Sequence, residues 1–292
     1  HVVTGRPFLL RVMGGGFLRP KNPVPGTDLA GTIEAVGDRV ARFAPGDDVF
    51  GEVVRGHQWK NAGAFAEFAA VPAKLLALKP PNVTFEEAAA VPTSGLIALK
   101  NLRDAGGASP GDKVLVNGAA GGVGLFAVQI AAAYGAQVTG VDTTAKLDTM
   151  RSAGADDVID YKQRDFTAGD ERYDMIIDIP GNRSFADLKR VLAPDGRYVL
   201  IGHDHYGDTG SRWIGPTIPR LLKLELTAPF GRRKRGDKPA DNALDLLDEL
   251  RKMLESDQIR PVIDRAFRLE QTAEALRYLM AGVARGKIVI TI

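Results

Sequence analysis

The sequence predicts an α/β protein with a doubly wound parallel sheet and a smaller β-barrel unit. From about residue 84 onward, strand-like and helix-like segments alternate along the chain, which is typical of βαβ units in a parallel sheet. A glycine-rich turn at residues 118–124 joins one of these strands directly to a helix. Before residue 84 the chain is rich in Gly, Pro, Val and Phe with few helical periods, which favours the short strands of a barrel.

The first part of the chain contains short apolar segments separated by turn residues. Gly37-Asp38 and Pro45-Gly46-Asp47 have the composition of tight turns. We expect strands on either side of these turns and further along the same part of the chain. The expected strands are Gly31–Val36, Asp48–Val53, Ala64–Ala69 and Leu75–Leu78.

The second part opens with Thr84 and Glu87, which have the spacing of a capping box and predict the start of a helix. Beyond it, helical and strand periods alternate. The expected helices are Ala88–Arg103, Val123–Tyr134, Ala145–Ala153, Ser184–Leu192, Asp241–Glu255 and Thr272–Met280. The expected strands are Lys113–Val116, Gln137–Val141, Val158–Asp160, Met175–Asp178, Tyr198–Ile201 and Lys287–Ile292.

The glycine-rich turn predicts an anion-binding site. Gly121 has no Cβ atom, so a diphosphate can approach the backbone there, and Gly124 lets the helix lie close to the strand. The amide groups at the start of the helix point toward such an anion. A tight turn without a ligand is the alternative interpretation of the glycines alone. Asp142 favours a dinucleotide, because it ends the next strand 18 residues after Gly124, where such folds place a ribose-binding acid.

Composition limits the possible classes of function. The chain has 292 residues, enough for two domains, and its 45% hydrophobic and 25% charged residues are ordinary for a globular protein. A net charge of +2 gives no sign of a nucleic-acid or membrane partner, and no apolar run reaches the ~20 residues of a membrane span. The basic cluster Arg232–Arg235 is expected to be a solvated loop. The absence of cysteine excludes disulfides and thiolate chemistry and, with no visible secretory signal, favours a cytoplasmic location.

A string of motifs in this order resembles the zinc-free, quinone-reductase-like branch of the medium-chain dehydrogenase/reductase family. The motifs are Pro25–Gly31, Pro45–Asp47, Gly63–Glu67, Ala88–Ala98, Ala119–Gly124, Gly154-Ala155, Asp160-Tyr161 and Gly286–Val289. The resemblance implies a GroES-like β-barrel domain at residues 1–90, a Rossmann domain at 91–236 and a return to the barrel at 237–292. It also implies an active site between the two domains.

The resemblance implies a zinc-independent oxidoreductase that transfers hydride between NAD(P)H and a quinone, an enone or another carbonyl substrate. The zinc branch of the family holds its metal through a segment that corresponds here to Gly26-Thr27-Asp28, and Ala89 stands where another ligand would be. The histidines His57, His203 and His205 show no ligand spacing. No metal site is therefore expected. The alternative function is a dinucleotide-binding protein without turnover, in a structural or regulatory role.

The resemblance also implies the roles of individual residues. The diphosphate would lie on Ala120, Gly121, Gly122, Val123 and Gly124. The candidates for a catalytic role are Thr93, near the nicotinamide, and His203, with His205 as a second histidine in the same loop. A hydroxyl bonded to the helix backbone and an exposed loop histidine are the competing interpretations. Gly202, at the end of a strand, would line the cofactor crevice.

The choice between NADP(H) and NAD(H) stays open at this point. Asp142 would bind a ribose diol and repel a 2′-phosphate, which favours NAD(H). Lys146 and Tyr161 match positions that hold the 2′-phosphate in quinone reductases of the family, which favours NADP(H). A Lys146–Asp142 ion pair would leave the lysine unavailable.

The resemblance implies two further properties of the chain. His1–Gly5 match the middle of the barrel pattern, so the first barrel strands of relatives have no counterpart here, as in a fragment or a shortened product. Relatives often pair by joining their parallel sheets edge to edge, so a homodimer is expected.

Overall fold

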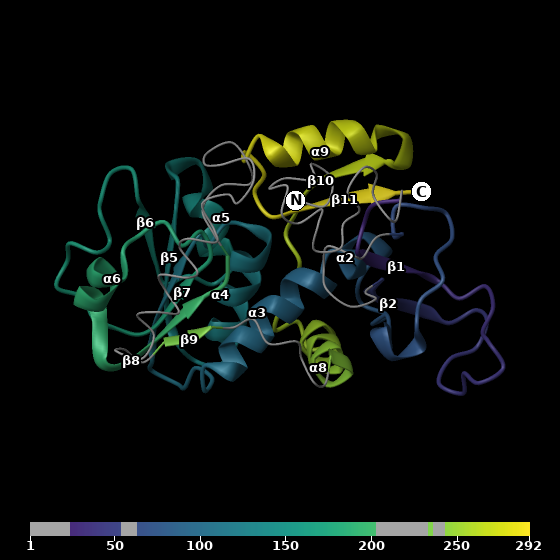
Figure 1. Cartoon of the computed structure of the whole chain (residues 1–292), viewed down its shortest axis with the longest axis horizontal. Coiled ribbons are helices and arrows are strands. Elements are labelled where there is room, and N and C mark those ends of the chain that lie inside the picture. The colour runs from purple at the N-terminus through teal and green to yellow at the C-terminus, as the bar shows by residue number, and fades with distance from the viewer. Residues whose placement is uncertain (1–23, 54–62, 203–232, 236–242) are drawn as a thin grey trace, which may run out of the picture.

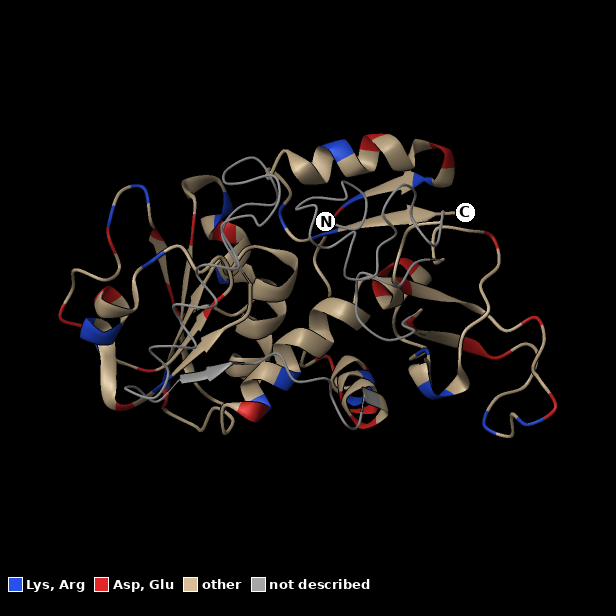
Figure 2. Ribbon diagram, in the orientation of Figure 1, with Lys and Arg blue, Asp and Glu red and all other residues tan. Residues whose placement is uncertain are grey.

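The computed structural model describes residues 24–53, 63–202, 233–235 and 243–292. A six-stranded sheet lies toward one end of the molecule and a three-stranded sheet toward the other, with helix α3 (Pro92–Asp104) between them (Figure 1). Charges of both signs are spread over the ribbon, whereas helix α4 (Gly122–Ala133) carries none (Figure 2). Among the described residues, no helix has the length and apolar character that a membrane crossing requires.

The six-stranded sheet is parallel throughout and confirms the predicted fold class. Its strands are β4 (Lys113–Asn117), β5 (Gln137–Asp142), β6 (Asp157–Asp160), β7 (Tyr173–Asp178), β8 (Leu192–Leu200) and β9 (Arg233–Arg235). Their order is β6-β5-β4-β7-β8-β9, with parallel pairing at every step. This is the doubly wound order of a Rossmann sheet, which changes direction between β4 and β7. Ligands of such sheets bind outside the carboxyl ends of the strands at that point.

Helices cover both faces of this sheet because strands β4 to β8 place apolar residues on both sides. On β4, Val114 and Val116 are buried in one core cluster and Leu115 in the other. The first cluster contains α4, whose residues are mostly buried and apolar with Gln129 as the exception, and the short helix α5 (Leu147–Ser152). The second cluster contains helix α6 (Phe185–Val191). A 3₁₀ turn, η4 (Thr144–Lys146), precedes α5.

The three-stranded sheet is antiparallel and consists of β1 (Asp28–Thr32), β2 (Asp48–Glu52) and β3 (Leu76–Leu78). A 3₁₀ turn, η3 (Ala73–Leu75), leads into β3. Phe43, Val49 and Leu76 form its small core. The register places Asp28, the first residue of β1, directly opposite Glu52, the last residue of β2. Two carboxylates are thus neighbours across one strand pair.

The C-terminal part of the chain returns from the parallel sheet to the smaller one. It contains α8 (Ala243–Glu255), β10 (Ile263–Arg268), the 3₁₀ turn η6 (Leu269–Gln271), α9 (Thr272–Met280) and β11 (Lys287–Thr291). Strands β10 and β11 form a parallel pair beneath α9 (Figure 1). Just before β11, Gly286 forms an isolated parallel bridge with Gly121 in the glycine turn. The end of the chain therefore contacts the turn between β4 and α4.

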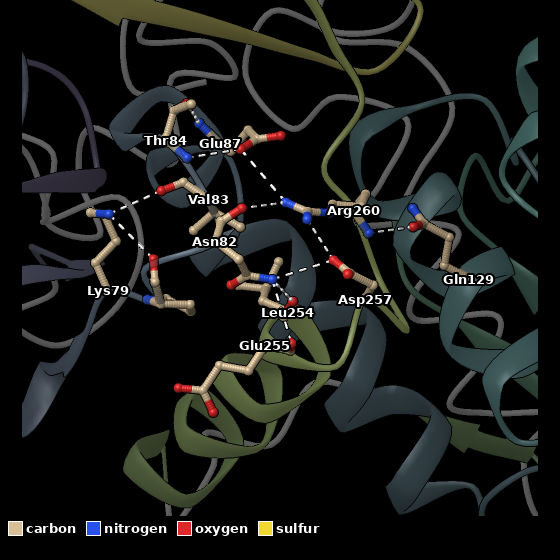
Figure 3. A network of polar contacts seen from close by, with 11 residues as sticks. Lys79, Asn82, Val83, Thr84, Glu87, Gln129, Leu254, Glu255, Asp257 and Arg260 are labelled. Carbon is tan, nitrogen blue, oxygen red and sulfur yellow. Dashed lines mark hydrogen bonds and ion pairs between the residues drawn. The ribbon is translucent and has the colours of Figure 1, made fainter.

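A polar network fixes α8 to the segment that enters helix α2 (Phe85–Ala89) (Figure 3). The Asn82 amide donates to Leu254 O at 2.9 Å, which caps the last turn of α8. The Arg260 guanidinium donates to Asn82 O at 3.0 Å and pairs with Asp257 at 2.5 Å. The backbone N–H of Arg260 donates to Gln129 Oε1 on α4 at 2.6 Å. Three regions that lie far apart in sequence thus meet at one arginine.

Several predicted elements differ from the structure. The predicted helix at Ala88–Arg103 is two helices, α2 and α3, because Pro92 cannot continue the first one. The capping box at Thr84 is confirmed. The strand predicted at Ala64–Ala69 is wrong. Its backbone bonds to Pro25 and Gly26 instead of joining the three-stranded sheet.

Two strands were not predicted, and one predicted strand is displaced. Strand β10 lacks an apolar run, and β9 lies within the basic cluster predicted to be a loop. Pairing to β8 makes that cluster a strand. Strand β1 spans Asp28–Thr32 rather than Gly31–Val36, because its register follows the pairing with β2.

Candidate dinucleotide site at the glycine turn

The glycine turn connects β4 to α4 with close backbone contacts on its protein side. The amides of Gly118 and Ala119 both donate to Val141 O on β5, at 2.9 and 3.1 Å. Gly118 has φ +80°, a conformation that favours glycine. A Cβ atom on Gly124 would lie 2.2 Å from Gly118 O, so only glycine allows the helix to sit this close to the strand. The sequence interpretation of Gly124 as a packing residue agrees with this geometry.

The ligand side of the same turn is open at Gly121. A Cβ atom there would meet nothing nearer than Gly118 O at 3.5 Å. Gly121 is the N-cap of α4, and no side chain caps the helix or places an acid in its first turn. Helix N-termini leave amide groups without intrahelical partners and carry partial positive charge. The turn therefore offers room and donors for an anion.

Lys287 crosses the head of α4 from the other end of the chain. A Cβ atom on Gly122 would lie 3.0 Å from Lys287 Cδ and 3.3 Å from Ser94 Oγ. The Lys287 ammonium donates to Ser94 Oγ at 2.9 Å and to Asp28 Oδ2 at 3.3 Å. Sequence reasoning missed this lysine as a site residue, because a single lysine opening a strand has no distinguishing spacing. The topology gives it a position beside the helix N-terminus.

Asp142 and Lys146 lie together at the carboxyl end of β5. The Asp142 carboxylate accepts hydrogen bonds from the amides of Ala120 at 3.2 Å and Thr143 at 2.8 Å. Lys146 Nζ lies 3.8 Å from Asp142 Oδ1, and both side chains are largely buried. The Tyr161 amide donates to Asp142 O at 3.2 Å, and the Tyr161 side chain is exposed. The structure therefore brings together Asp142, which favours NAD(H), with Lys146 and Tyr161, which favour NADP(H).

The segment after β7 and the carboxyl end of β8 lie beside the glycine turn. Asp178 is fully buried and accepts hydrogen bonds from the Asn117 amide and from the Tyr198 hydroxyl, both at 2.9 Å. Pro180 would lie 3.0 Å from a Cβ atom on Gly118, so this segment packs directly on the glycine turn. A Cβ atom on Gly202 would lie 2.5 Å from Ile179 O. Asp178 is thus held in a structural network beside the site.

Thr93 bonds to two carboxylates rather than to the helix backbone. Its hydroxyl contacts Asp28 Oδ1 and lies 2.6 Å from Glu52 Oε1, and its amide donates to Asp28 Oδ1 at 3.1 Å. Burial, followed by the neighbouring charge of Asp28, raises the pKa of Glu52 to about 7. Sequence reasoning identified neither Asp28 nor Glu52 as a site residue. The two acids are 24 positions apart in the sequence and meet only through the register of β1 and β2.

Some candidate residues fall outside the structure's described part. These are the histidines His57, His203 and His205. Within the described ranges, no group of three or more His, Asp or Glu side chains is arranged to hold a metal ion.

Two sequence profiles match the chain. The profile of the zinc-binding dehydrogenases matches residues 153–290, and that of the alcohol dehydrogenase GroES-like domain matches residues 6–81. The 2-methylene-furan-3-one reductase of Solanum lycopersicum is 34% identical over 280 residues, which cover 93% of this chain and 64% of that protein. A mitochondrial NAD(P)H oxidoreductase of Homo sapiens is 30% identical over 293 residues, which cover 91% of this chain and 70% of that protein.

The fold is also similar to solved structures. The quinone oxidoreductase from Coxiella burnetii superposes with a TM-score of 0.78 at 27% identity, over 93% of this chain and 80% of that one. The chain spans about 64% of the length of the tomato reductase.

Proposed function

Because the chain belongs to the medium-chain dehydrogenase/reductase family, we propose that it is an NAD(P)-dependent oxidoreductase acting on a quinone, an enone or another carbonyl compound. Membership confirms the resemblance seen in the sequence, including the pairing of a GroES-like domain with a Rossmann-like sheet. The names of similar proteins support this substrate class: one reduces a furanone, and another is a quinone oxidoreductase.

One observation carries the proposal: an open, uncapped helix N-terminus lies at the direction change of a Rossmann sheet. Gly121 leaves space on the ligand side, while Gly124 closes the protein side of the same turn. These features fit the diphosphate of a dinucleotide, which needs close backbone approach and positive potential. When bound, the nicotinamide ring supplies or accepts the hydride.

The chain's own residues would bind and orient the dinucleotide. The amides of residues 122–124 would hold the diphosphate, with the Lys287 ammonium beside them. The amides of Ala120 and Gly121 line the same turn but donate within the protein, to Asp142 Oδ2 and Gly118 O. Asp142, Lys146 and Tyr161 would face the adenosine ribose. We place Thr93 near the nicotinamide, as the family resemblance implies. Its bonds to Asp28 and Glu52 fix its orientation.

Binding is tested by isothermal titration calorimetry with NAD⁺, NADH, NADP⁺ and NADPH. The Gly121→Asp variant should lose at least about tenfold in affinity, because its carboxylate occupies the open side and repels the diphosphate. The matched control is Gly169→Asp, in an exposed loop with no close neighbours, which should bind normally. Normal affinity in the Gly121→Asp variant would refute the proposed diphosphate seat.

We also propose that the reaction needs no zinc. The chain contains no cysteine, and Thr27 and Ala89 stand where the zinc branch of the family has ligands. Elemental analysis of purified protein should find less than stoichiometric zinc, and turnover should survive dialysis against a chelator. Zinc bound at one equivalent, with activity lost on its removal, would contradict this proposal.

Binding without turnover is the second candidate function. The Thr93 hydroxyl is already bonded within the protein, which is one observation in favour of this alternative. The two functions separate in an assay of reduced dinucleotide with phenanthrenequinone, followed by the loss of nicotinamide absorbance. An oxidoreductase consumes the dinucleotide over many cycles. A binding protein gives the calorimetric signal with no consumption.

We propose that the protein forms a homodimer, as the family resemblance implies. Strands β6 and β9 are the two edges of the described parallel sheet and are the places where edge-to-edge pairing would occur. Light scattering after size-exclusion chromatography should give twice the chain mass of 31.3 kDa.

A further inference from the structure

We propose that the carboxyl groups of Asp28 and Glu52 share a proton, and that dinucleotide binding is accompanied by proton uptake at this acid pair. Both residues lie beside the diphosphate seat and have no assigned role in binding the diphosphate. The inference rests on the proposed function for the presence of a dinucleotide. The proton comes from solvent and converts one carboxylate to a carboxylic acid, with no other change in bonding.

The hydrogen bonds of Thr93 support a shared proton. The Thr93 hydroxyl contacts one oxygen of each acid, and its amide also donates to Asp28. A hydroxyl has a single hydrogen and can donate it to one carboxylate at a time. Ionised carboxylates only accept hydrogen bonds. The second contact therefore requires a proton on one of the two acids, which then donates to the Thr93 oxygen.

Strand register and burial also favour one negative charge on the acid pair rather than two. Asp28 and Glu52 are directly opposite across β1 and β2, where like charges destabilise the pair. Burial and the charge of Asp28 raise the pKa of Glu52, while the Thr93 hydrogen bond and the Lys287 charge oppose the shift. The Glu52 carboxyl, with a pKa of about 7, therefore titrates near neutrality and responds to any further charge placed nearby.

Asp28 on β1 and Lys287 on β11 are the charged groups that act on Glu52 within the described residues. On α2, Glu87 is committed to the Thr84 capping box. On α3, Lys100 pairs with Asp104 near the far end of that helix. Strand β3 carries no charged residue.

Lys287 connects the acid pair to the diphosphate seat. Its ammonium donates to Asp28 Oδ2 at 3.3 Å, while its aliphatic stem lies over Gly122 at the head of α4. A diphosphate on the α4 amides would add negative charge near the acid pair. It would also compete with Asp28 for the Lys287 ammonium. Both effects disfavour a second negative charge on the acid pair. Proton uptake restores the balance of charge around Lys287.

The test measures proton uptake during binding of NAD⁺ and NADP⁺. Calorimetry in two buffers with different ionisation enthalpies gives the number of protons bound per dinucleotide. At pH values around 7, where Glu52 titrates, the wild-type protein should take up a fraction of a proton. Its affinity should weaken as pH rises, by up to about tenfold per unit.

Two variants separate the acid pair from other carboxylates. Glu52→Gln cannot ionise, so it should bind the dinucleotide without proton uptake and with an affinity that varies little with pH. Glu34→Gln, which changes an exposed acid beyond β1, should behave like the wild type. Infrared difference spectra of the wild type should gain a protonated-carboxyl band on binding, which tests the inference without any substitution.

The outcomes distinguish this inference from the proposed function. Dinucleotide binding with no proton uptake, or uptake that persists in Glu52→Gln, would overturn the inference and leave the proposed function intact. Absence of binding by any pyridine dinucleotide would overturn both. Uptake confined to proteins that retain Glu52, together with the carboxyl band, would establish the acid pair as the proton acceptor.

Discussion

Glycines three positions apart in one turn serve opposite needs. Gly124 is surrounded by backbone atoms of residues 118 and 119, whereas Gly121 faces open space. The sequence shows a glycine motif without distinguishing the roles of its glycines. In the structure, the fold requires Gly124, whereas Gly121 leaves room for a ligand. Substitution at the two positions should therefore have different consequences.

Gly124→Ala should destabilise the protein by about 1–3 kcal/mol, the usual cost of forcing an extra methyl group into a packed site. Gly121→Ala should cost about 1 kcal/mol or less, because its new Cβ has space and only the N-cap preference changes. Urea denaturation followed by circular dichroism measures both. Equal losses at the two positions would contradict the packing argument.

Glu52 should make stability fall as pH rises toward neutrality. Its pKa is about 7 in the folded protein, against the ordinary value of 4.5 for a glutamate, so the unfolded chain loses its proton first. Between these values the folded state binds more protons, and the free energy of unfolding declines with pH. At about 1.4 kcal/mol per pKa unit, discounted for partial exposure, the total is about 2 kcal/mol.

The Glu52→Gln variant should lack this contribution. Relative to wild type, its free energy of unfolding should rise by about 2 kcal/mol between pH 4.5 and 7. Chemical denaturation over this pH range measures the difference. A constant gap between the two proteins would show that Glu52 ionises normally in the folded state.

At the scale of elements, the β4–α4 unit contains most of the predicted binding machinery. Its strand is apolar on both faces and its helix is mostly apolar, so both are largely buried and the turn between them is fixed. Asp142, from the next strand, supports this turn by accepting the Ala120 amide. The same carboxylate thus has a structural contact and a position from which it would influence cofactor choice.

Asp142→Asn should shift preference toward NADPH. Asn keeps a hydrogen-bond acceptor for the turn but removes the charge that opposes a 2′-phosphate and pairs with Lys146. The ratio of kcat/KM for NADPH to that for NADH should rise about tenfold, equivalent to about 1.4 kcal/mol. Lys146→Met should move the ratio in the other direction. An unchanged ratio in Asp142→Asn would dismiss Asp142 as the selector.

Sequence patterns predicted the elements whose contacts are local. The helix at Thr272–Met280 matches the structure at both ends, and strands β4 to β7 lie where apolar runs occur. The helix interrupted at Pro92 and the strand expected at Ala64–Ala69 were wrong. In the latter, Phe65 packs against Gly26, and the segment pairs with no neighbouring strand among the described residues. Periodicity alone cannot distinguish these arrangements.

Residues brought together only by topology were beyond sequence reasoning. The glycine turn and Asp142 are close in sequence and form a recognisable motif. Lys287, Asp28 and Glu52 come from three separate strands, and no spacing relates them. The acid pair depends on the register of β1 and β2, which a shift of one residue would abolish.

At the scale of the whole molecule, the larger and smaller sheets are connected through the C-terminal return and the network around Arg260 (Figure 3). This arginine contacts the segment before α2, the end of α8 and, through its backbone, α4. It is one of several ties between segments distant in sequence. We therefore expect it to contribute to global stability rather than to binding.

Arg260→Ala should lower the free energy of unfolding by about 1–2 kcal/mol, through loss of the bond to Asn82 O and the pair with Asp257. Arg164→Ala, which removes an exposed pair with Asp157, should change it by less than about 0.5 kcal/mol. Thermal unfolding measures both. Dinucleotide affinity should be the same in the two variants, so a selective loss of binding in Arg260→Ala would contradict this assignment.

The bridge between Gly121 and Gly286 has a consequence for biosynthesis. Strands β4 to β8 are complete at residue 200, yet the segment that crosses the glycine turn is synthesised more than 80 residues later. A nascent chain can thus acquire the glycine turn long before Gly286 emerges to complete its surroundings. A chain cut just before Gly286 would keep these five strands but would have an unfinished cofactor seat.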